Sequence, residues 1–236
     1  MKIGILQCDH VLEKFVSEHG TYPQMYSALF DNVQLDVQFE LYDVTLGEYP
    51  LDIDECDAYI TTGSKCGVND DLSWLEGLEN FVLKLHQAKK KFVGICFGHQ
   101  LVAKALGGRV ELSPKGWGIG LSFNQIDARK SWMRPYSEGM DLVVSHQDQV
   151  VVLPAQAQVL ASSDFCPYYM IQYEEHFLTI QGHPEFPKGY SESLMDDRRN
   201  RIPARRIREG MVSLLAETNE ELCAIWIYKF FSTASK

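Results

Sequence analysis

The stretch Phe92-Val93-Gly94-Ile95-Cys96-Phe97-Gly98-His99-Gln100 decides the fold prediction for this 236-residue chain. Its first residues are apolar or small and predict a buried strand, and the residues after Cys96 predict the start of a helix. Between the two lies a G-x-C-x-G turn, which is the cysteine form of the nucleophile elbow. Gly94 and Gly98 leave room for the strained backbone that such a turn imposes on its central residue.

The elbow makes Cys96 a candidate nucleophile. The turn lifts the sulfur clear of the sheet and sets it at the positive end of a helix dipole, which favours the thiolate. The backbone N–H of Phe97 is then free to donate to an oxyanion on an attacked carbonyl. The alternative is a buried core cysteine in a glycine-rich turn, because free cysteine is among the most buried residue types. The pattern alone leaves both interpretations open.

Apolar and β-branched runs alternate with helical periodicity on both sides of the elbow. This alternation predicts an α/β fold with a mostly parallel open sheet and helices on both faces. Residues 110–159 carry more turn signals and predict antiparallel additions to the sheet. We expect a single domain over residues 1–236, mostly helical from about residue 188. The predicted strands are 2–7, 36–42, 58–62, 92–95 and 177–181, and the predicted helices are 72–90, 98–106, 189–200, 204–217 and 220–231.

Composition limits the class of protein. Apolar residues make up 45% of the chain, which is enough for a substantial core. The formal net charge is -10, and this charge argues against nucleic-acid or anionic-membrane partners because both need clustered basic residues. The six cysteines form no C-x-x-C pair, so we expect free thiols, no metal site and no cofactor. The apolar run near the N-terminus is too short for a signal peptide or a membrane span. A cytoplasmic location is therefore expected.

A second segment, Ile180-Gln181-Gly182-His183-Pro184-Glu185, ends a predicted strand with a histidine and a carboxylate two residues apart. A cysteine nucleophile needs an imidazole partner, and that imidazole needs a carboxylate to fix its tautomer. In an extended segment the side chains of His183 and Glu185 point to the same side. A lone H-P-E segment is more often a surface turn, but its pairing with the elbow is far more specific.

Together, segments 94–100 and 181–185 resemble the two signature motifs of class I (triad-type) glutamine amidotransferases, and the similarity extends to about residue 190. The resemblance implies a flavodoxin-like fold and a reaction in which the cysteine attacks the γ-amide of glutamine. A γ-glutamyl thioester forms, ammonia leaves, and water then releases glutamate. By resemblance, Cys96 is the nucleophile, His183 the general base and acid, and Glu185 the residue that orients His183.

Further residues match the same family. Segment 61–64 follows a predicted strand and resembles the oxyanion loop, so the backbone of Gly63 would be the second donor beside Phe97. The residues that would hold the amino-acid head of the substrate, by the same resemblance, are Ser64, Gln100, Ser145, His146, Gln147 and Asp148. For these polar side chains, turn formation and helix capping are the alternative interpretation.

The match is closest to stand-alone members that are similar to GMP synthase, including γ-glutamyl peptidases. The chain lacks a P-loop and an ATP-pyrophosphatase domain, so no ammonia acceptor is visible within it. We therefore expect hydrolysis of a γ-glutamyl amide, either glutamine or a γ-glutamyl peptide. The alternatives are a glutaminase subunit that serves a separate synthetase and a partner-gated regulatory module. Cysteine hydrolases and stress proteins that share the elbow lack the H-P-E pairing at residues 183–185.

Three other features have a structural interpretation that competes with a functional one. Trp117, in the glycine-rich segment 115–120, is either a pocket wall or part of a turn between strands. The basic cluster at Arg198, Arg199, Arg201, Arg205, Arg206 and Arg208 could receive an anion, but a solvated helix face is the preferred interpretation. The segment Cys8-Asp9-His10 ends the first strand, where a cap and a packed thiol suffice to explain it.

Overall fold

In the computed structural model, which describes residues 1–233, the chain is built around one eight-stranded sheet. The strands lie in the order β2 (Gln38–Asp43), β1 (Lys2–Gln7), β3 (Ala58–Thr61), β4 (Lys91–Ile95), β12 (Phe177–Ile180), β11 (Met170–Tyr173), β10 (Ala157–Ser162) and β7 (Gln125–Ile126). The first five strands are parallel, and the last three join antiparallel. The predicted α/β fold with a mostly parallel sheet is confirmed.

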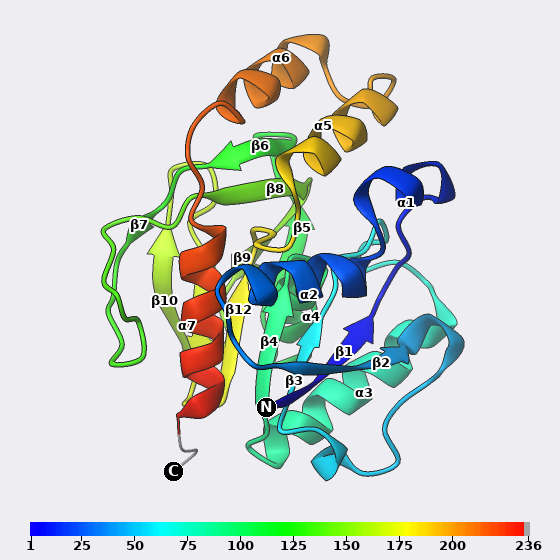
Figure 1. Cartoon of the computed structure of the whole chain (residues 1–236), viewed down its shortest axis with the longest axis vertical. Helices are drawn as coiled ribbons and strands as arrows, with labels where there is room; N and C mark the ends of the chain where they lie inside the picture. The colour runs from blue at the N-terminus through cyan, green and yellow to red at the C-terminus, as the bar shows by residue number, and fades with distance from the viewer. Residues whose placement is uncertain (234–236) are drawn as a thin grey trace.

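Helices cover both faces of the sheet (Figure 1). One face carries α2 (Tyr22–Asn32) and α7 (Glu220–Ser232), and the other carries α3 (Ser73–Gln87) and α4 (Phe97–Ala105). Strand residues alternate between the two cores: Val93 and Ile95 of β4 pack on the α7 side, whereas Phe92 packs on the α3 side. A parallel strand buried on both faces reads as a continuous apolar run, which is the pattern that residues 92–95 show.

The prediction for residues 110–159 is partly wrong. Only β7 and the start of β10 extend the main sheet; the rest forms two separate antiparallel pairs, β5 (Arg109–Leu112) with β9 (Asp148–Val152) and β6 (Gly118–Ser122) with β8 (Leu142–His146). The physical reason is a third apolar cluster, to which β6 contributes Ile119 and Leu121 and β8 contributes Val143. These three side chains are therefore buried away from the main sheet, whereas β5 and β9 pack Val110 and Val150 into the core on the α3 side.

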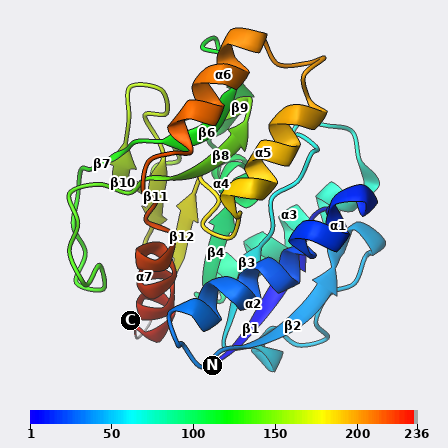
Figure 2. The same cartoon turned by 45° about the horizontal axis from the view of Figure 1, so that its top comes forward.

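The C-terminal part is helical, as predicted, with α5 (Lys188–Asp197) and α6 (Ala204–Ser213) preceding α7. Pro203 precedes the first residue of α6 and separates it from α5. Figure 2 shows α5 and α6 above the carboxyl ends of the parallel strands, where α5 lies beside α1 (Glu13–His19). The sequence analysis did not predict α1 or α2. Two short 3-10 helices, η1 (Val44–Leu46) and η2 (Ile53–Glu55), follow β2.

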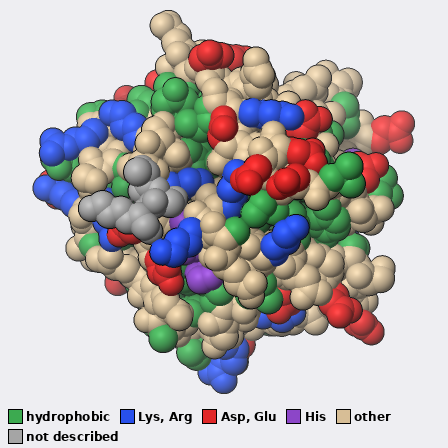
Figure 3. Space-filling view, turned by 90° about the horizontal axis from the view of Figure 1, so that it is seen from below, with side chains coloured by type: hydrophobic (Ala, Val, Ile, Leu, Met, Phe, Trp, Pro, Cys, Tyr) green, Lys and Arg blue, Asp and Glu red, His purple; other side chains and the backbone are tan. Residues whose placement is uncertain are grey.

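The opposite end of the molecule, where the N-terminus and the end of α7 lie, carries acidic and basic side chains in a mixed arrangement (Figure 3). Across residues 1–233, none of the helices is both long and apolar enough to cross a membrane. The carboxyl end of the sheet, by contrast, is the edge where α/β proteins bind their ligands. Segments 94–100 and 181–185, which contain the predicted catalytic residues, lie at that edge.

Candidate active site

Cys96 occupies the turn between β4 and α4 with φ 48° and ψ -91°, a conformation that a residue with a side chain rarely adopts. The two flanking glycines are required by close packing. A Cβ atom on Gly98 would lie 1.9 Å from Oγ1 of Thr61, and one on Gly94 would lie 2.7 Å from the backbone of Gly98. The backbone N–H of Cys96 donates to the Ile180 carbonyl at 2.8 Å. The elbow predicted from the sequence is therefore present.

His183 and Glu185 lie together, with 2.7 Å between Nδ1 of the imidazole and Oε1 of the carboxylate. Both side chains are buried. The His183 ring stacks on Phe186 with 3.8 Å between ring centroids, and its backbone N–H donates to the Val143 carbonyl at 2.8 Å. Because Nδ1 faces the carboxylate, Nε2 is the ring nitrogen that remains for proton exchange.

The charge state of His183 follows from these neighbours. Burial alone disfavours the imidazolium, but the negative charges of Glu185 and Cys96 and their hydrogen bonds outweigh it and raise the pKa of His183. An imidazole that keeps its proton beside a cysteine can stabilise a thiolate. The three residues thus form the electrostatic arrangement that a cysteine nucleophile needs.

A chain of amide side chains runs along the cysteine. Nε2 of Gln181 donates to Sγ of Cys96 at 3.4 Å, and Nε2 of Gln100 donates to Oε1 of Gln181 at 3.1 Å and to the Asp148 carbonyl at 2.8 Å. Gln181 was not among the predicted site residues. Its place at the end of β12, two residues before His183, was the available signal, because residues at that spacing share a side of an extended segment.

The loop that contains Gly63 lies against the imidazole. A Cβ atom on Gly63 would be 2.6 Å from Cε1 of His183, so glycine is needed for this approach. Phe97, the second predicted oxyanion donor, is the first residue of α4, and its N–H therefore has no partner within the helix. Both predicted donors thus lie beside the nucleophile and its imidazole.

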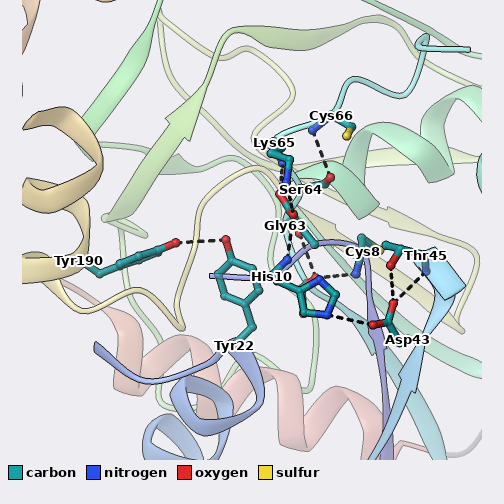
Figure 4. Close-up of polar contacts among 12 residues, drawn as sticks. Cys8, His10, Tyr22, Asp43, Thr45, Gly63, Ser64, Lys65, Cys66 and Tyr190 are labelled. Atoms are coloured by element: carbon teal, nitrogen blue, oxygen red, sulfur yellow. Dashed lines mark hydrogen bonds and ion pairs between the residues drawn. The ribbon is translucent and has the colours of Figure 1, made fainter. Parts of the chain in front are cut away.

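The loop is held from below by the end of β1 (Figure 4). Asp9, which is buried, accepts from the backbone N–H of Lys65 at 2.8 Å and from its Nζ at 2.9 Å. The Cys8 N–H donates to Oγ1 of Thr62 at 2.9 Å, and that hydroxyl donates to the Gly63 carbonyl. The sequence analysis set Asp9 aside as a cap, whereas the structure places it under the predicted oxyanion loop.

Two adjoining hollows open at this edge of the sheet. The first, which we name the cysteine cavity, has a volume of about 290 Å³. Most of the predicted site residues line it, together with Trp117 and two arginines that were assigned to a solvated face. The predicted site residues in its lining are Ser64, Cys96, Phe97, Gln100, Ser145, His146, Gln147 and Asp148. Its lining also includes Trp117, Arg198 and Arg201.

The second hollow, which we name the histidine hollow, has a volume of about 200 Å³ and lies on the imidazole side. It shares Ser64, Lys65, Ser145, Arg198 and Arg201 with the cysteine cavity. Its own lining comes from the loop, the end of β1 and α5, and includes Asp9, His10, Tyr22, Gly63, His183, Phe186, Tyr190 and Leu194. Figure 4 shows Tyr22 and Tyr190 with their hydroxyls joined, on the far side of His10 from Asp43.

Several predicted substrate-binding side chains are already engaged within the protein. Ser64 accepts from the Cys66 N–H at 3.1 Å, as expected of a turn residue. Ser145 accepts from Nη1 of Arg198 at 2.7 Å. His146 is buried, which lowers its pKa to about 4, so its ring is neutral at physiological pH. Burial raises the pKa of the Asp148 carboxyl, and the nearby Asp70 adds to that effect.

The basic cluster divides into two groups. Arg199 pairs with Asp196, and Arg205 and Arg206 pair with Glu209, which is the solvated face that was expected. Arg198 and Arg201 instead line the cavity, and both guanidinium groups lie over the Trp117 ring, at 5.9 and 5.7 Å from its centroid. The interpretation of the whole cluster as a helix face was therefore incomplete.

Comparison with known families supports the motifs. A family model described as glutamine amidotransferase class-I matches residues 32–197, which is more than half of the chain. The chain belongs to the class I glutamine amidotransferases. A solved structure of a glutamine amidotransferase from Thermotoga maritima superposes with a TM-score of 0.75 at 19% identity over 98% of this chain and 99% of that one. At that identity the likeness shows the shared fold.

Among curated relatives, gamma-glutamyl peptidase 3 of Arabidopsis thaliana is 35% identical over 198 residues, covering 80% of this chain and 78% of its own length. A glutamine-hydrolyzing GMP synthase subunit of Sulfurisphaera tokodaii is 31% identical over 140 residues, covering 58% of this chain and 72% of its own length. The two names represent two uses of the family fold, a peptidase and one component of a synthase.

Proposed function

We propose that this amidotransferase-family chain hydrolyses a γ-glutamyl amide bond through a γ-glutamyl thioester on Cys96. The observation that carries the proposal is the buried group formed by Cys96, His183 and Glu185, in which Cys96 lines the cysteine cavity and His183 lines the histidine hollow. The similarity to gamma-glutamyl peptidase 3 supports a γ-glutamyl peptide as substrate, and glutamine is the smaller alternative. No cofactor is needed, because the chemistry uses only a thiol, an imidazole and water.

In the first half-reaction, the Cys96 thiolate attacks the γ-carbonyl carbon, and the carbonyl electron pair moves to oxygen. The N–H groups of Gly63 and Phe97 would donate to that oxyanion. The C–N bond then breaks as the His183 imidazolium gives its proton to the departing nitrogen. The products are an amine, or ammonia when glutamine is the substrate, and the thioester on Cys96.

In the second half-reaction, water attacks the thioester carbon while His183, now neutral, takes a proton from it. The C–S bond breaks, glutamate leaves, and the thiolate and imidazolium are restored, so the sum of both steps is one amide bond hydrolysed by one water. Glu185 keeps the imidazole in the orientation that both proton transfers need. The groups proposed to hold the glutamyl head are Ser64, Gln100, Ser145, His146, Gln147 and Asp148.

The test is glutamate release from glutamine and from glutathione by the wild-type chain and by Cys96→Ala, without any partner. Release that depends on Cys96, together with a mass increase of one glutamyl group on that residue in rapidly quenched samples, is the expected result. Cys66→Ala is the matched control, because Cys66 lines the same cavity and has no proposed role in bond cleavage. Equal release by wild type and Cys96→Ala would refute the proposal.

A second candidate function is supported by the similarity to the GMP synthase component: a glutaminase that passes ammonia to a separate synthetase. In that case the isolated chain would act slowly on glutamine and not on glutathione, and a synthetase would accelerate it. A partner-gated regulatory module would turn over neither substrate on its own. The single-domain organisation and the cytoplasmic location both stay predictions, and the first hypothesis requires neither.

A further inference from the structure

We propose that the histidine hollow is a leaving-group subsite, and that Arg198 and Arg201 bind a free carboxylate at the far end of the departing amine. This inference rests on the proposed γ-glutamyl hydrolysis and narrows its substrates to γ-glutamyl peptides with a C-terminal carboxylate. The two hollows share five lining residues, including both arginines. The cysteine cavity contains Cys96 and Gln100, whereas the histidine hollow contains His183 and lacks both of these residues.

The direction of bond cleavage assigns each hollow a part of the substrate. The carbonyl carbon must sit at Cys96, and the departing nitrogen must meet His183, which gives it a proton. The glutamyl head therefore occupies the side of the cysteine cavity that holds Gln100. Whatever the nitrogen carries extends toward the histidine hollow. Glutamine carries nothing there, because its leaving group is ammonia, so in a pure glutaminase a hollow of about 200 Å³ beside His183 would hold no part of the substrate.

The charges around this hollow leave the arginines available. Its two carboxylates are each paired with a lysine, Asp9 with Lys65 and Asp197 with Lys14. Among residues 1–233, neither Arg198 nor Arg201 forms an ion pair with a carboxylate, although their neighbours Arg199, Arg205 and Arg206 all do. The hollow thus presents two guanidinium groups whose charge is not offset by an ion pair.

The arginines are also held in place. Nη1 of Arg198 donates to Ser145 at 2.7 Å, and the Trp117 ring lies under both guanidinium groups. A guanidinium held over the face of an aromatic ring spends no N–H donor on that contact, and the remaining donors match the two oxygens of a carboxylate. Both arginines also line the histidine hollow, which Gln100 does not, so a carboxylate bound to them on that side would lie within reach of the leaving group.

The experiment compares kcat/KM for glutathione and for its C-terminal amide, which differ only in the carboxylate. For the wild type we expect the free acid to be preferred. Arg201→Gln should reduce the acid-to-amide ratio by about 10- to 100-fold, the usual range for a charged hydrogen bond. Arg198→Gln should act in the same direction. Arg199→Gln, in the same segment but paired with Asp196, should leave the ratio unchanged.

Each other outcome overturns the inference. An unchanged ratio in Arg201→Gln would mean that no carboxylate binds there. An equal loss with acid, amide and glutamine would place the arginines against the glutamyl head instead. If the wild type cleaves none of these compounds, the proposed function fails, and binding to Cys96→Ala decides the subsite separately. Calorimetry should then show glutathione bound more tightly than its amide, and equal affinities would refute the subsite.

Discussion

The floor of the site and its outer wall are built in different ways. Cys96, His183 and Glu185 form the floor and are 5%, 3% and 3% exposed, held by the ends of β4 and β12 and by backbone hydrogen bonds. Arg198, Arg201 and Trp117 form the wall and lie on segments outside the main sheet, partly or fully in contact with solvent. If the proposed roles hold, bond cleavage depends on rigid packing, whereas substrate choice depends on side chains that can change with little effect on the fold.

The largest loss should follow a change that leaves the floor in place but alters its charge. Glu185→Gln keeps the shape of the side chain and removes the charge that orients the imidazole, so kcat should fall by about 10³- to 10⁴-fold. Glutamate release measures this loss. Glu192→Gln, which alters an exposed residue of α5, is the control and should retain full activity. A Glu185→Gln variant with more than a tenth of wild-type kcat would remove Glu185 from the proposed triad.

The same variant has a spectroscopic signature. The negative charge of Glu185 raises the pKa of His183 against the effect of burial, so Glu185→Gln should lower that pKa. The imidazole resonances, followed against pH by nuclear magnetic resonance, should therefore shift at lower pH in the variant than in the wild type. An unchanged titration would mean that the carboxylate does not control the imidazole, even if activity had fallen for another reason.

A smaller loss should follow from crowding the imidazole. Gly63→Ala adds a Cβ atom that would lie 2.6 Å from Cε1 of His183, so either the loop or the ring must move. A displacement near 1 Å at a reacting group costs about 10²-fold, and we expect that reduction in kcat/KM with an unchanged unfolding midpoint. The control is Gly189→Ala in α5, where the added atom meets only ordinary van der Waals contacts. Wild-type activity in Gly63→Ala would contradict the geometry of the loop.

A substitution of Asp9, which lies beneath the loop that contains Gly63, should reduce kcat/KM less. Asp9→Asn removes the buried charge that accepts the hydrogen bond from the Lys65 N–H, and we expect about a 10-fold fall in kcat/KM, because hydrogen bonds to charged groups are the strong ones. Lys65→Met removes only the ion pair, whose lysine side chain is 63% exposed, and should cost less than about 3-fold. Equal losses in the two variants would show that the ion pair, and not the backbone contact, holds the loop.

The floor could be predicted from the sequence because its requirements are local. A nucleophile elbow needs glycines at fixed positions around the cysteine, and a strand end fixes the spacing of His183 and Glu185, so short segments carry the whole signal. The mostly parallel sheet could be predicted for the same reason, since apolar runs such as residues 92–95 indicate strands that are buried on both faces. What the sequence could not show is how segments far apart in the chain meet.

Three features of the structure depend on contacts between segments that are far apart in the sequence. The pair β6–β8 contributes to a third apolar cluster together with α5 and α6, whereas the pair β5–β9 packs Val110 and Val150 into the core on the α3 side. The role of Asp9 depends on the approach of residues 9 and 65. Arg198 and Arg201 carry the same periodic and charge signals as Arg199 and Arg205, and only the position of Trp117 separates the two groups. Local patterns cannot distinguish a paired arginine from an unpaired one.

The smallest expected effect lies in the wall and bears on the proposed subsite. Trp117→Leu removes the ring beneath both guanidinium groups but keeps the backbone carbonyl that accepts from Arg206. Cation–π contacts near a surface are worth about 0.5–1 kcal/mol, so KM for glutathione should rise about 2- to 5-fold while kcat stays the same. Phe123→Leu, a change at an exposed aromatic residue outside both hollows, is the control. A fall in kcat instead of a rise in KM would place Trp117 on the floor, and the separation between the two regions would then be wrong.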